Sequence, residues 1–484
     1  MLITGAEKLE RMRDGREVYV GSERVKDVTS HPAFAQGART IAEMWDWKRD
    51  PSRRDLLTYE ENGERHNLYW LRPRSRDDLA RRMAAMKALA DFTFGLVGRT
   101  PDQVATLVAG LATKPDVLDS VRRGFGENLL AYYDHARKND FFLTFAAVAP
   151  AGLRTAELYA GAERDVPSLR VVEEDDRGVY LSGIKILATS AIYADELYIG
   201  NLTPLDPKHD SHSITCAMPM NTKGLALWSR QPFASHGRHE ADYPLSWRYD
   251  ESDAMVVCDR AHVPWERVFL HMNGAMSRQI YLDTPGMSYA NHHSTVRPWS
   301  KMGLITGLAS RIAEAAGIEK IAGVREQLGR FAQLEATIAA LDAGQIEGWE
   351  SWPEGYATPN RRYMYAAIAW GQDHHSIVID ELRTLLGSMP LQMPASTDVL
   401  DDAGLRDKFE RWWASPGMSA LDRLKLYKLA WDLVGSEFAG RHQLYEKFYA
   451  GNYINNRNHN FREAPWARFH GMVDGLMARI GSPG

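Results

Sequence analysis

Asp140–Thr155, DFFLTFAAVAPAGLRT, is the stretch around which this chain is organised. It starts as an unbroken apolar run and stops at a turn, where Pro150 removes a backbone donor and Gly152 permits a positive φ. Arg154 follows the turn directly. A cation beside the exposed N–H groups of a Gly/Ala turn suits an anion such as a pyrophosphate. An ordinary loop with a solvated arginine is the alternative that these residues leave open.

The composition is typical of a soluble globular protein with several domains. The 484 residues exceed what one core holds, and the 44% hydrophobic and 25% charged contents are ordinary for such proteins. A net charge of −5 provides no basic surface for nucleic acid or membranes, and no apolar window reaches the roughly 18 residues of a spanning helix. Cys216 and Cys258 are the only cysteines, which excludes a disulfide framework and a cysteine-held metal cluster. We therefore expect a cytoplasmic protein without a signal peptide, a metal site, a membrane segment or a nucleic-acid partner.

The N-terminal third is predicted to be mainly helical. A capping box at Ser75 opens an amphipathic helix, and the spacing of aromatic residues predicts another helix over 117–138. Residues 36–60 are polar with little periodicity, so they predict no regular element.

The pattern then changes to β and back to helix. Short alternating runs from about residue 169 to 269 predict a compact β domain, opened by a hairpin around Asp175–Gly178. From about residue 299 apolar residues recur at three and four, and long helices are predicted over 365–386 and 421–449, which favours an antiparallel bundle. The predicted domains are a mainly helical one (1–145), a middle β domain (146–275) and a C-terminal helix bundle (276–484).

The segment GRTPDQ, residues 98–103, predicts the start of a helix. Thr100 at the N-cap, Pro101 in the first turn and Gln103 make a second capping box. Arg99 precedes this start and adds a full charge to the positive end of the helix dipole. That is a favourable place for a phenolate, carboxylate or phosphate, although simple solvation of Arg99 remains the alternative.

Five blocks of sequence resemble the 4-hydroxyphenylacetate 3-monooxygenase family, the large oxygenase components of two-component flavin monooxygenases. They are RDGREVYV with ERVKDVTSHPAF (13–34), GRTPD (98–102), LTFAAVAP (143–150), ATSAIYADE (188–196) and RYDESDAMVVCDRAHVPWERVF (248–269), and the likeness extends to GRHQLYEKFYAGN (440–452). The resemblance implies an acyl-CoA dehydrogenase-like fold, mainly α with a central β domain. Its parts would be an N-terminal helical domain, a middle β-barrel and a C-terminal four-helix bundle.

The resemblance also implies that FAD binds as FADH2 between the β domain and the bundle, with O2 as co-substrate. Thr189 would offer its hydroxyl near N5 of the flavin, although a threonine bonded within the sheet is the simpler interpretation. Arg441 matches an arginine near the flavin, and Phe145 would line the cofactor and the substrate. The remaining residues implied to contact FAD are Ala151, Gly152, Leu153 and Arg154 at its diphosphate or ribityl chain, and Ala450, Gly451, Asn452 and Tyr453 as a cover.

Three positions depart from the family's hydroxyphenylacetate enzymes around the implied substrate site, which Arg99 and Thr100 would face. Phe145 replaces a histidine, Gln103 replaces a tyrosine, and Trp247 stands where a small serine is common. The lost donors and the added bulk would leave a small phenol with unpaired polar groups. We therefore expect 4-hydroxyphenylacetate to be a poor substrate.

A catalytic base is expected in Asn291-His292-His293. The chlorophenol and nitrophenol monooxygenases of the wider family are similar in placing a base here, paired with the arginine that matches Arg99. A neutral imidazole can accept a phenol proton while Arg99 stabilises the phenolate. The sequence does not decide between His292 and His293, and a bundle histidine bonded to a backbone carbonyl is the alternative.

The function implied is an FADH2-dependent monooxygenase that hydroxylates a phenolic ring through a flavin C4a-hydroperoxide. Reduced flavin would come by diffusion from a separate NAD(P)H:flavin reductase, and no GxGxxG follows a strand in this chain. Hydroxylation at nitrogen, or of a carrier- or peptide-bound aromatic, is the first alternative, and a catalytically inactive scaffold is the second. The resemblance and the broad apolar helix faces predict a homotetramer.

Overall fold

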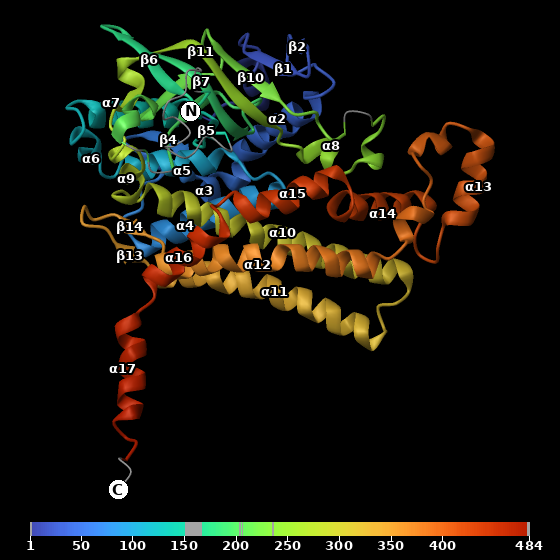
Figure 1. The fold of residues 1–484 in the computed structure, drawn as a ribbon. Helices are drawn as coiled ribbons and strands as arrows, with labels where there is room; N and C mark the ends of the chain where they lie inside the picture. The colour runs from blue at the N-terminus through green and yellow to red at the C-terminus, as the bar shows by residue number, and fades with distance from the viewer. Residues whose placement is uncertain (1, 151–166, 203–204, 206, 235–236, 482–484) are drawn as a thin grey trace.

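A computed structural model describes residues 2–150, 167–202, 205, 207–234 and 237–481 (Figure 1). The predicted order of a helical, a β and a second helical region is confirmed. Ala151, Gly152, Leu153 and Arg154, implied to contact flavin, lie outside the described residues.

The N-terminal region is helical, with two departures from prediction. The helix predicted over 117–138 is wrong as one element, because Gly124 adopts φ 97 and separates two helices. Residues 36–60 contain an unpredicted helix whose buried face includes the polar residues Thr40 and Lys48, so the polar composition hid its pattern. The helices are α1 (Gly5–Arg11), α2 (Ala35–Arg49), α3 (Arg54–Leu57), α4 (Arg76–Phe92), α5 (Pro101–Leu111), α6 (Asp116–Asp119) and α7 (Phe125–Lys138).

The larger sheet of the β region combines strands from two parts of the chain. The N-terminal strand β1 pairs in parallel with β10, and the predicted hairpin at Asp175–Gly178 joins β6 to β7. The sheet order is β2 (Glu23–Val25), β1 (Glu17–Val20), β10 (Leu225–Ser229), β11 (Asp253–Pro264), β7 (Gly178–Thr189) and β6 (Arg170–Asp175).

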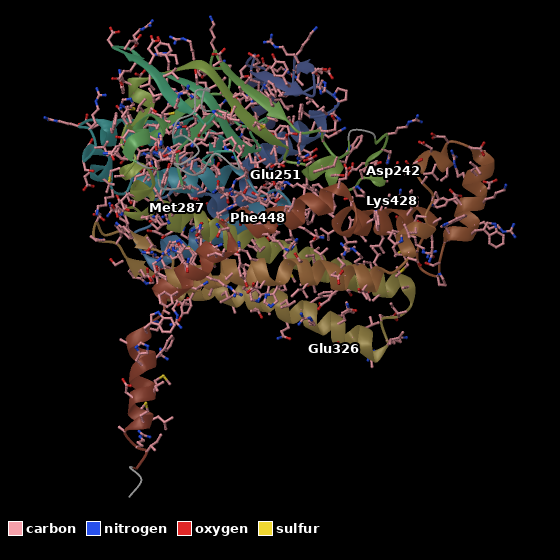
Figure 2. All side chains as sticks on the ribbon, viewed as in Figure 1. Asp242, Glu251, Met287, Glu326, Lys428 and Phe448 are labelled. Carbon is pink, nitrogen blue, oxygen red and sulfur yellow. The ribbon has the colours of Figure 1, made fainter. Side chains whose placement is uncertain are left out.

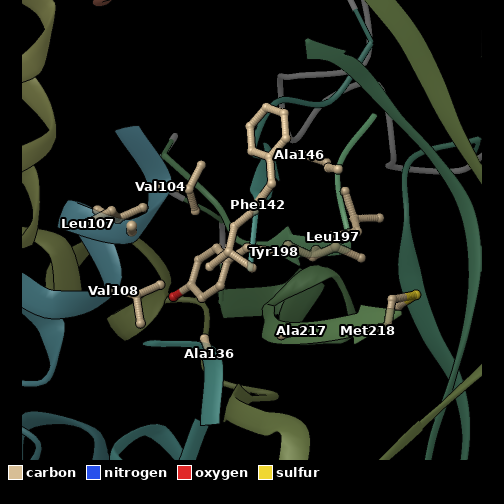
Figure 3. Close-up of a cluster of buried hydrophobic side chains, with 14 of the residues drawn as sticks. Val104, Leu107, Val108, Ala136, Phe142, Ala146, Leu197, Tyr198, Ala217 and Met218 are labelled. Carbon is tan, nitrogen blue, oxygen red and sulfur yellow. The ribbon is translucent and has the colours of Figure 1, made fainter. Parts of the chain in front are cut away.

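The apolar run of 141–148 forms an edge of a second sheet. Its strand β5 (Leu143–Ala146) pairs in parallel with β8 (Glu196–Ile199), followed by β9 (Ile214–Pro219) and β12 (Val268–His271). Val104, Leu107 and Val108 of α5 pack towards Phe142 and Tyr198 in the core (Figure 3). The run therefore ties α5 to the β region, as its unbroken hydrophobicity indicates. Two-stranded ribbons are β3 (Thr58–Glu61) with β4 (Glu64–Asn67), and β13 (Glu350–Ser351) with β14 (Ala357–Thr358).

The C-terminal region contains long helices packed side by side (Figure 1). The first begins at Gly286, earlier than predicted, and continues through Pro298. The helix predicted over 421–449 is divided at Gly435, beside which the ring of Trp431 leaves no room for a side chain. The helices are α9 (Met276–Leu282), α10 (Gly286–Ala316), α11 (Ala322–Glu347), α12 (Arg361–Leu386), α13 (Ala403–Trp413), α14 (Ala420–Val434), α15 (Glu437–Phe448), α16 (Tyr453–Glu463) and α17 (Trp466–Met477).

Helix α5 lies between the bundle and the β region. It packs against α10 on one side and β5 on the other, so its first turn opens where the three regions meet. In contrast, α17 projects away from the remaining structure (Figure 1). Among the described residues no helix combines the length and the hydrophobicity that crossing a membrane requires.

Candidate active site

The first turn of α5 contacts the bundle through Thr100. Its hydroxyl lies 2.9 Å from Nε2 of His293 on α10 and makes no capping bond. The capping box predicted with Gln103 is therefore wrong, because a tertiary contact takes the hydroxyl. The N–H groups of Gly98 and Arg99 both donate to Oε2 of Glu251, at 2.8 Å each.

Arg99 is a half-buried cation between aromatic rings. Its guanidinium carbon lies 6.0 Å from the ring centroid of Tyr445 and 5.3 Å from that of Tyr449, and one nitrogen donates weakly, at 3.4 Å, to the carbonyl of Tyr449. Across the part of the chain that the structure covers, no carboxylate pairs with Arg99 within 4.0 Å. An arginine without a counter-ion at a helix N-terminus is suited to an anionic ligand.

The two histidines of α10 have different surroundings. Both ring nitrogens of His292 are buried without hydrogen bonds in the described structure, and burial together with Arg82 lowers its pKa to about 3. His293 instead faces α5 with Nε2 near Thr100, while its Nδ1 is buried and has no protein partner among the described residues. The structure brings His293, and not His292, to the start of α5.

Other buried polar atoms around this start also lack partners within the described residues. They include Oε1 of Gln103, the hydroxyl of Tyr445 and both carboxylate oxygens of Asp102. Tyr445 reaches α5 so closely that a side chain at Gly98 would lie 2.2 Å from its ring. Buried polar atoms are normally satisfied by protein, water or a ligand. This unused hydrogen-bonding capacity fits an occupant with several polar atoms, as a flavin ring and a phenol have.

A charged network joins the bundle to the β region beside this corner. Arg441 of α15 donates to Glu251 at 2.6 Å and to both oxygens of Asp253 at 2.8 and 3.0 Å. The hydroxyl of Thr189 donates to Asp253 at 2.8 Å, which leaves its lone pairs to accept a bond from a bound N–H. Figure 2 labels Glu251 at this junction. Arg441 and Thr189, assigned to flavin by resemblance, therefore meet at one carboxylate.

We expect this network to make stability depend on pH in the acid range. Burial alone would raise the pKa of Asp253, but Arg441 and Arg230 lower it to about 2. Because the pKa is lower folded than unfolded, the stabilisation is complete above roughly pH 4 and is lost as the pH falls towards 2. Asp253→Asn should destabilise the protein by about 2 kcal/mol at pH 7 and by progressively less below pH 4. Denaturant unfolding at several pH values checks this, with the exposed Asp176→Asn as control. A loss of unfolding free energy in Asp253→Asn that is the same at all pH values would contradict this expectation.

A second buried cluster, not predicted from the sequence, lies within the bundle. Glu446 of α15 accepts bonds from Arg297 at 2.8 and 2.5 Å and also contacts Lys301. Arg441, Tyr445 and Tyr449 are spaced by four residues and so share one face of the chain around α15, a spacing that would have placed the two tyrosines beside Arg441. The pairing of Glu446 with residues of α10 could not be predicted, because no pattern in the sequence around Glu446 indicates a partner so far along the chain.

The remaining predicted residues lie at different distances from this corner. Phe145 is on β5, with its ring near those of Tyr198 and Tyr281. The 450–453 segment links α15 to α16, and Gly451 is held by a bond from Gln372 to its carbonyl. Trp247 is on the short helix α8 (Ser246–Tyr249), whose Ser246 bonds to Asp432 of α14. Within the described residues no hydrogen bond or ring contact joins Trp247 to Arg99, so its role in the pocket stays a prediction.

Comparison with known proteins identifies the family to which this arrangement belongs. The family model described as 4-hydroxyphenylacetate 3-hydroxylase N terminal matches residues 4–270, and the C-terminal model matches residues 277–478. The 4-nitrophenol 2-monooxygenase oxygenase component of Rhodococcus sp is 32% identical over 469 residues, which cover 93% of this chain and 86% of that protein. The pyoverdin chromophore biosynthetic protein PvcC of Pseudomonas aeruginosa is 30% identical over 454 residues, covering 93% and 89%.

A solved structure matches nearly the whole chain. The oxygenase component of 4-hydroxyphenylacetate 3-monooxygenase, in complex with FAD and 4-hydroxyphenylacetate, superposes with a TM-score of 0.91 at 27% identity and covers 98% of each chain. The acyl-CoA dehydrogenase-like fold and the use of FAD are thereby confirmed, and the inactive-scaffold alternative is not supported. The chain belongs to the 4-hydroxyphenylacetate 3-hydroxylase family, and it is the oxygenase component of a two-component, flavin-dependent aromatic monooxygenase.

Proposed function

We propose that this enzyme hydroxylates a phenol that it holds as the phenolate against Arg99, with His293 as the base. The observation that carries the proposal is the half-buried guanidinium of Arg99, which has no carboxylate partner among the described residues and shares the first turn of α5 with the Thr100–His293 contact. A cation in this position stabilises the anionic ring oxygen, and a phenolate is more electron-rich than a phenol. The Rhodococcus relative, named for 4-nitrophenol, makes 4-nitrophenol the first substrate to test. The resemblance to chlorophenol monooxygenases adds 4-chlorophenol.

Each residue has a distinct role in the proposed reaction. Bound reduced FAD supplies the oxygen-transfer chemistry, and Thr189 and Arg441 are the described residues that would hold it. Arg99 binds and orients the phenolate oxygen. His293 contacts the residue next to Arg99 through Nε2, and its Nδ1, which makes no hydrogen bond in the described structure, accepts the phenol proton. Burial of the site strengthens both interactions by excluding water.

His293 suits the role of base better than His292. The ring of His292 touches no hydrogen-bonding group among the described residues, and its lowered pKa disfavours proton uptake. His293 is oriented by Thr100, whose neighbour in the chain is the substrate-binding Arg99. A base must lie within reach of the proton that it removes, and His293 is the α10 histidine whose ring contacts the residue next to Arg99.

Restoring the two family donors should move selectivity towards 4-hydroxyphenylacetate. Phe145→His together with Gln103→Tyr should raise kcat/KM for this substrate, relative to 4-nitrophenol, by about tenfold or more, because each regained hydrogen bond is worth about 1 kcal/mol. Each single change should do less, since α5 and β5 pack together and the donors act as a pair. Steady-state kinetics on both substrates provide the measurement. Efficient use of 4-hydroxyphenylacetate by the unaltered enzyme would contradict the role given to these positions.

The proposed assembly is a homotetramer that involves the C-terminal helix. Helix α17 has no buried residue, and an isolated helix of its length is unstable in water, so another surface must cover it. Its stripe of exposed apolar side chains includes Met472 and Leu476, which are 67% and 63% exposed.

We expect Met472→Asp with Leu476→Asp to lower the mass of the assembly. Two carboxylates on the stripe would have to be buried in the interface, which is costly. Light scattering at micromolar concentration should give a tetramer for the unaltered chain and a smaller species for the variant. Asp474→Lys, outside the stripe, controls for the change of charge. A monomer before any substitution would refute the assembly.

The proposal places the enzyme in the cytoplasm with a separate NAD(P)H:flavin reductase that supplies FADH2. Its direct test is a substrate panel of 4-nitrophenol, 4-chlorophenol, 4-hydroxyphenylacetate and aniline, with FADH2 delivered by an unrelated reductase. Ring hydroxylation of the nitro- or chlorophenol is the expected result. Exclusive oxidation at nitrogen, or no hydroxylated product with any phenol, would overturn the proposal.

A further inference from the structure

Asp102 is a buried carboxylate directed at the histidine that the reaction uses. It is fully buried in the first turn of α5, and neither of its oxygens has a hydrogen-bond donor among the described residues. Its Oδ1 lies 3.4 Å from Nε2 of His293, within reach of a charge contact but not aligned as a hydrogen bond. A buried carboxylate without its own donors is costly, so this position calls for an explanation.

The contacts of Nε2 determine which nitrogen of His293 carries the proton. Nε2 faces the hydroxyl of Thr100 at 2.9 Å and the carboxylate of Asp102 at 3.4 Å. An N–H on Nε2 would point towards the oxygens of Thr100 and Asp102, so these two contacts favour the tautomer with the proton on Nε2. Nδ1 then carries the free lone pair, and Nδ1 is the atom that is buried without a protein partner in the described structure.

We propose that Asp102 is a positioning residue that holds His293 as the Nε2–H tautomer, so that Nδ1 accepts the proton of the phenol. This rests on the proposed function. The phenol O–H bond breaks and an Nδ1–H bond forms. The imidazolium then lies beside the carboxyl group of Asp102 while the phenolate lies beside Arg99. The proton later leaves His293 for water, which restores the neutral ring.

Charged and polar groups other than His293 also lie near Asp102, and Lys48 is one whose charge interacts with its carboxyl group. In the described structure Asp102 is the carboxylate that pairs with His293 within 4.0 Å. The other titratable groups facing this part of α10, or lying near Asp102, are His292 on α10 itself, Arg82 of α4, Asp342 of α11, Tyr365 of α12, Tyr449 of α15, and Lys48 and Tyr69 of the N-terminal region. The alternative is that Asp102 only stabilises the N-terminus of α5, where its carboxyl group lies at the positive end of the helix dipole. An experiment must distinguish this structural role from the positioning of His293.

Asp102→Asn tests the proposal through the acidity of the substrate. At pH 8, 4-chlorophenol is largely un-ionised and needs a base, whereas 4-nitrophenol is already ionised. We expect the variant to hydroxylate 4-chlorophenol at least about 100-fold more slowly and 4-nitrophenol at nearly the original rate. Asp342→Asn replaces another buried carboxylate, one that contacts α10 from the side of α11, and should leave both rates unchanged. Equal slowing of both substrates by Asp102→Asn would overturn the proposal in favour of a structural role.

A spectrum gives a second readout that does not depend on turnover. 4-Nitrophenol is bound at pH 6, without oxygen, to the enzyme that holds reduced FAD, and its absorption spectrum is recorded. We expect the spectrum of the phenolate in the unaltered enzyme and that of the un-ionised phenol in Asp102→Asn. Retention of the phenolate spectrum in the variant would overturn the proposal. Should the asparagine variant not fold, Asp102→Ser is measured in the same way. If the unaltered enzyme hydroxylates neither phenol, the proposed function itself is refuted. If it is active and Asp102→Asn changes neither rate, this inference alone is refuted.

Discussion

Arg99→Ala is expected to abolish product formation while oxygen consumption continues. The guanidinium of Arg99 lies between the rings of Tyr445 and Tyr449 and has no carboxylate partner among the described residues, so the substrate oxygen is the partner left for it. Without this cation a phenolate would be buried unpaired, at a cost of several kcal/mol, and would bind poorly. Reducing equivalents should then appear as hydrogen peroxide, because the flavin still reacts with oxygen.

Peroxide and hydroxylated product, measured in the same reaction, check this expectation. In Arg99→Lys only part of the oxygen consumed should lead to hydroxylated product, since a lysine retains the charge but not the planar guanidinium that can donate two parallel hydrogen bonds. Arg311→Ala, at an exposed arginine of the bundle, is the matched control and should remain fully coupled. Coupled hydroxylation by Arg99→Ala would remove this residue from the substrate site.

His293→Ala should slow hydroxylation of weakly acidic phenols by about two to four orders of magnitude. The substitution removes Nδ1, which we assign as the acceptor of the phenol proton, and leaves Arg99 in place. Raising the pH should restore much of the rate, because the phenol then ionises without a base. Single-turnover kinetics with reduced FAD separate this step from flavin binding.

His292→Ala is the informative comparison. Its ring is equally buried but has a pKa lowered to about 3 and no contact with α5 through a hydrogen bond. We expect a loss of stability from the cavity and little change in the rate of hydroxylation. A large loss of rate in His292→Ala and a small one in His293→Ala would assign the role of base to His292 instead.

Local signals predicted the parts of the site that a few neighbouring residues determine. Thr100 and Pro101 marked the start of α5, and that start placed Arg99 correctly at a helix N-terminus. The same signals failed where a distant group intervened, because the hydroxyl of Thr100 turns to His293 instead of capping the helix. Capping preferences describe an isolated helix, whereas this one begins against α10.

Long-range pairs could not be predicted, since nothing in the chain marks them. The carboxylate of Glu446 is 149 residues from Arg297, and Asp102 is 191 positions before His293. Helix α2 was missed for a different reason, because polar residues such as Thr40 and Lys48 lie on its buried face and mask the apolar spacing. The family resemblance, not periodicity, supplied the flavin and the histidine pair.

Isotope labelling of the product tests the proposed reaction most directly. The purified chain is mixed anaerobically with chemically reduced FAD and 4-nitrophenol, and then with oxygen-18 gas, in the absence of any reductase. A catechol that carries one labelled oxygen atom per ring is the expected product. Hydrogen peroxide with unlabelled, unaltered 4-nitrophenol, and the same outcome with 4-chlorophenol, would contradict the assignment of this enzyme as a phenol hydroxylase.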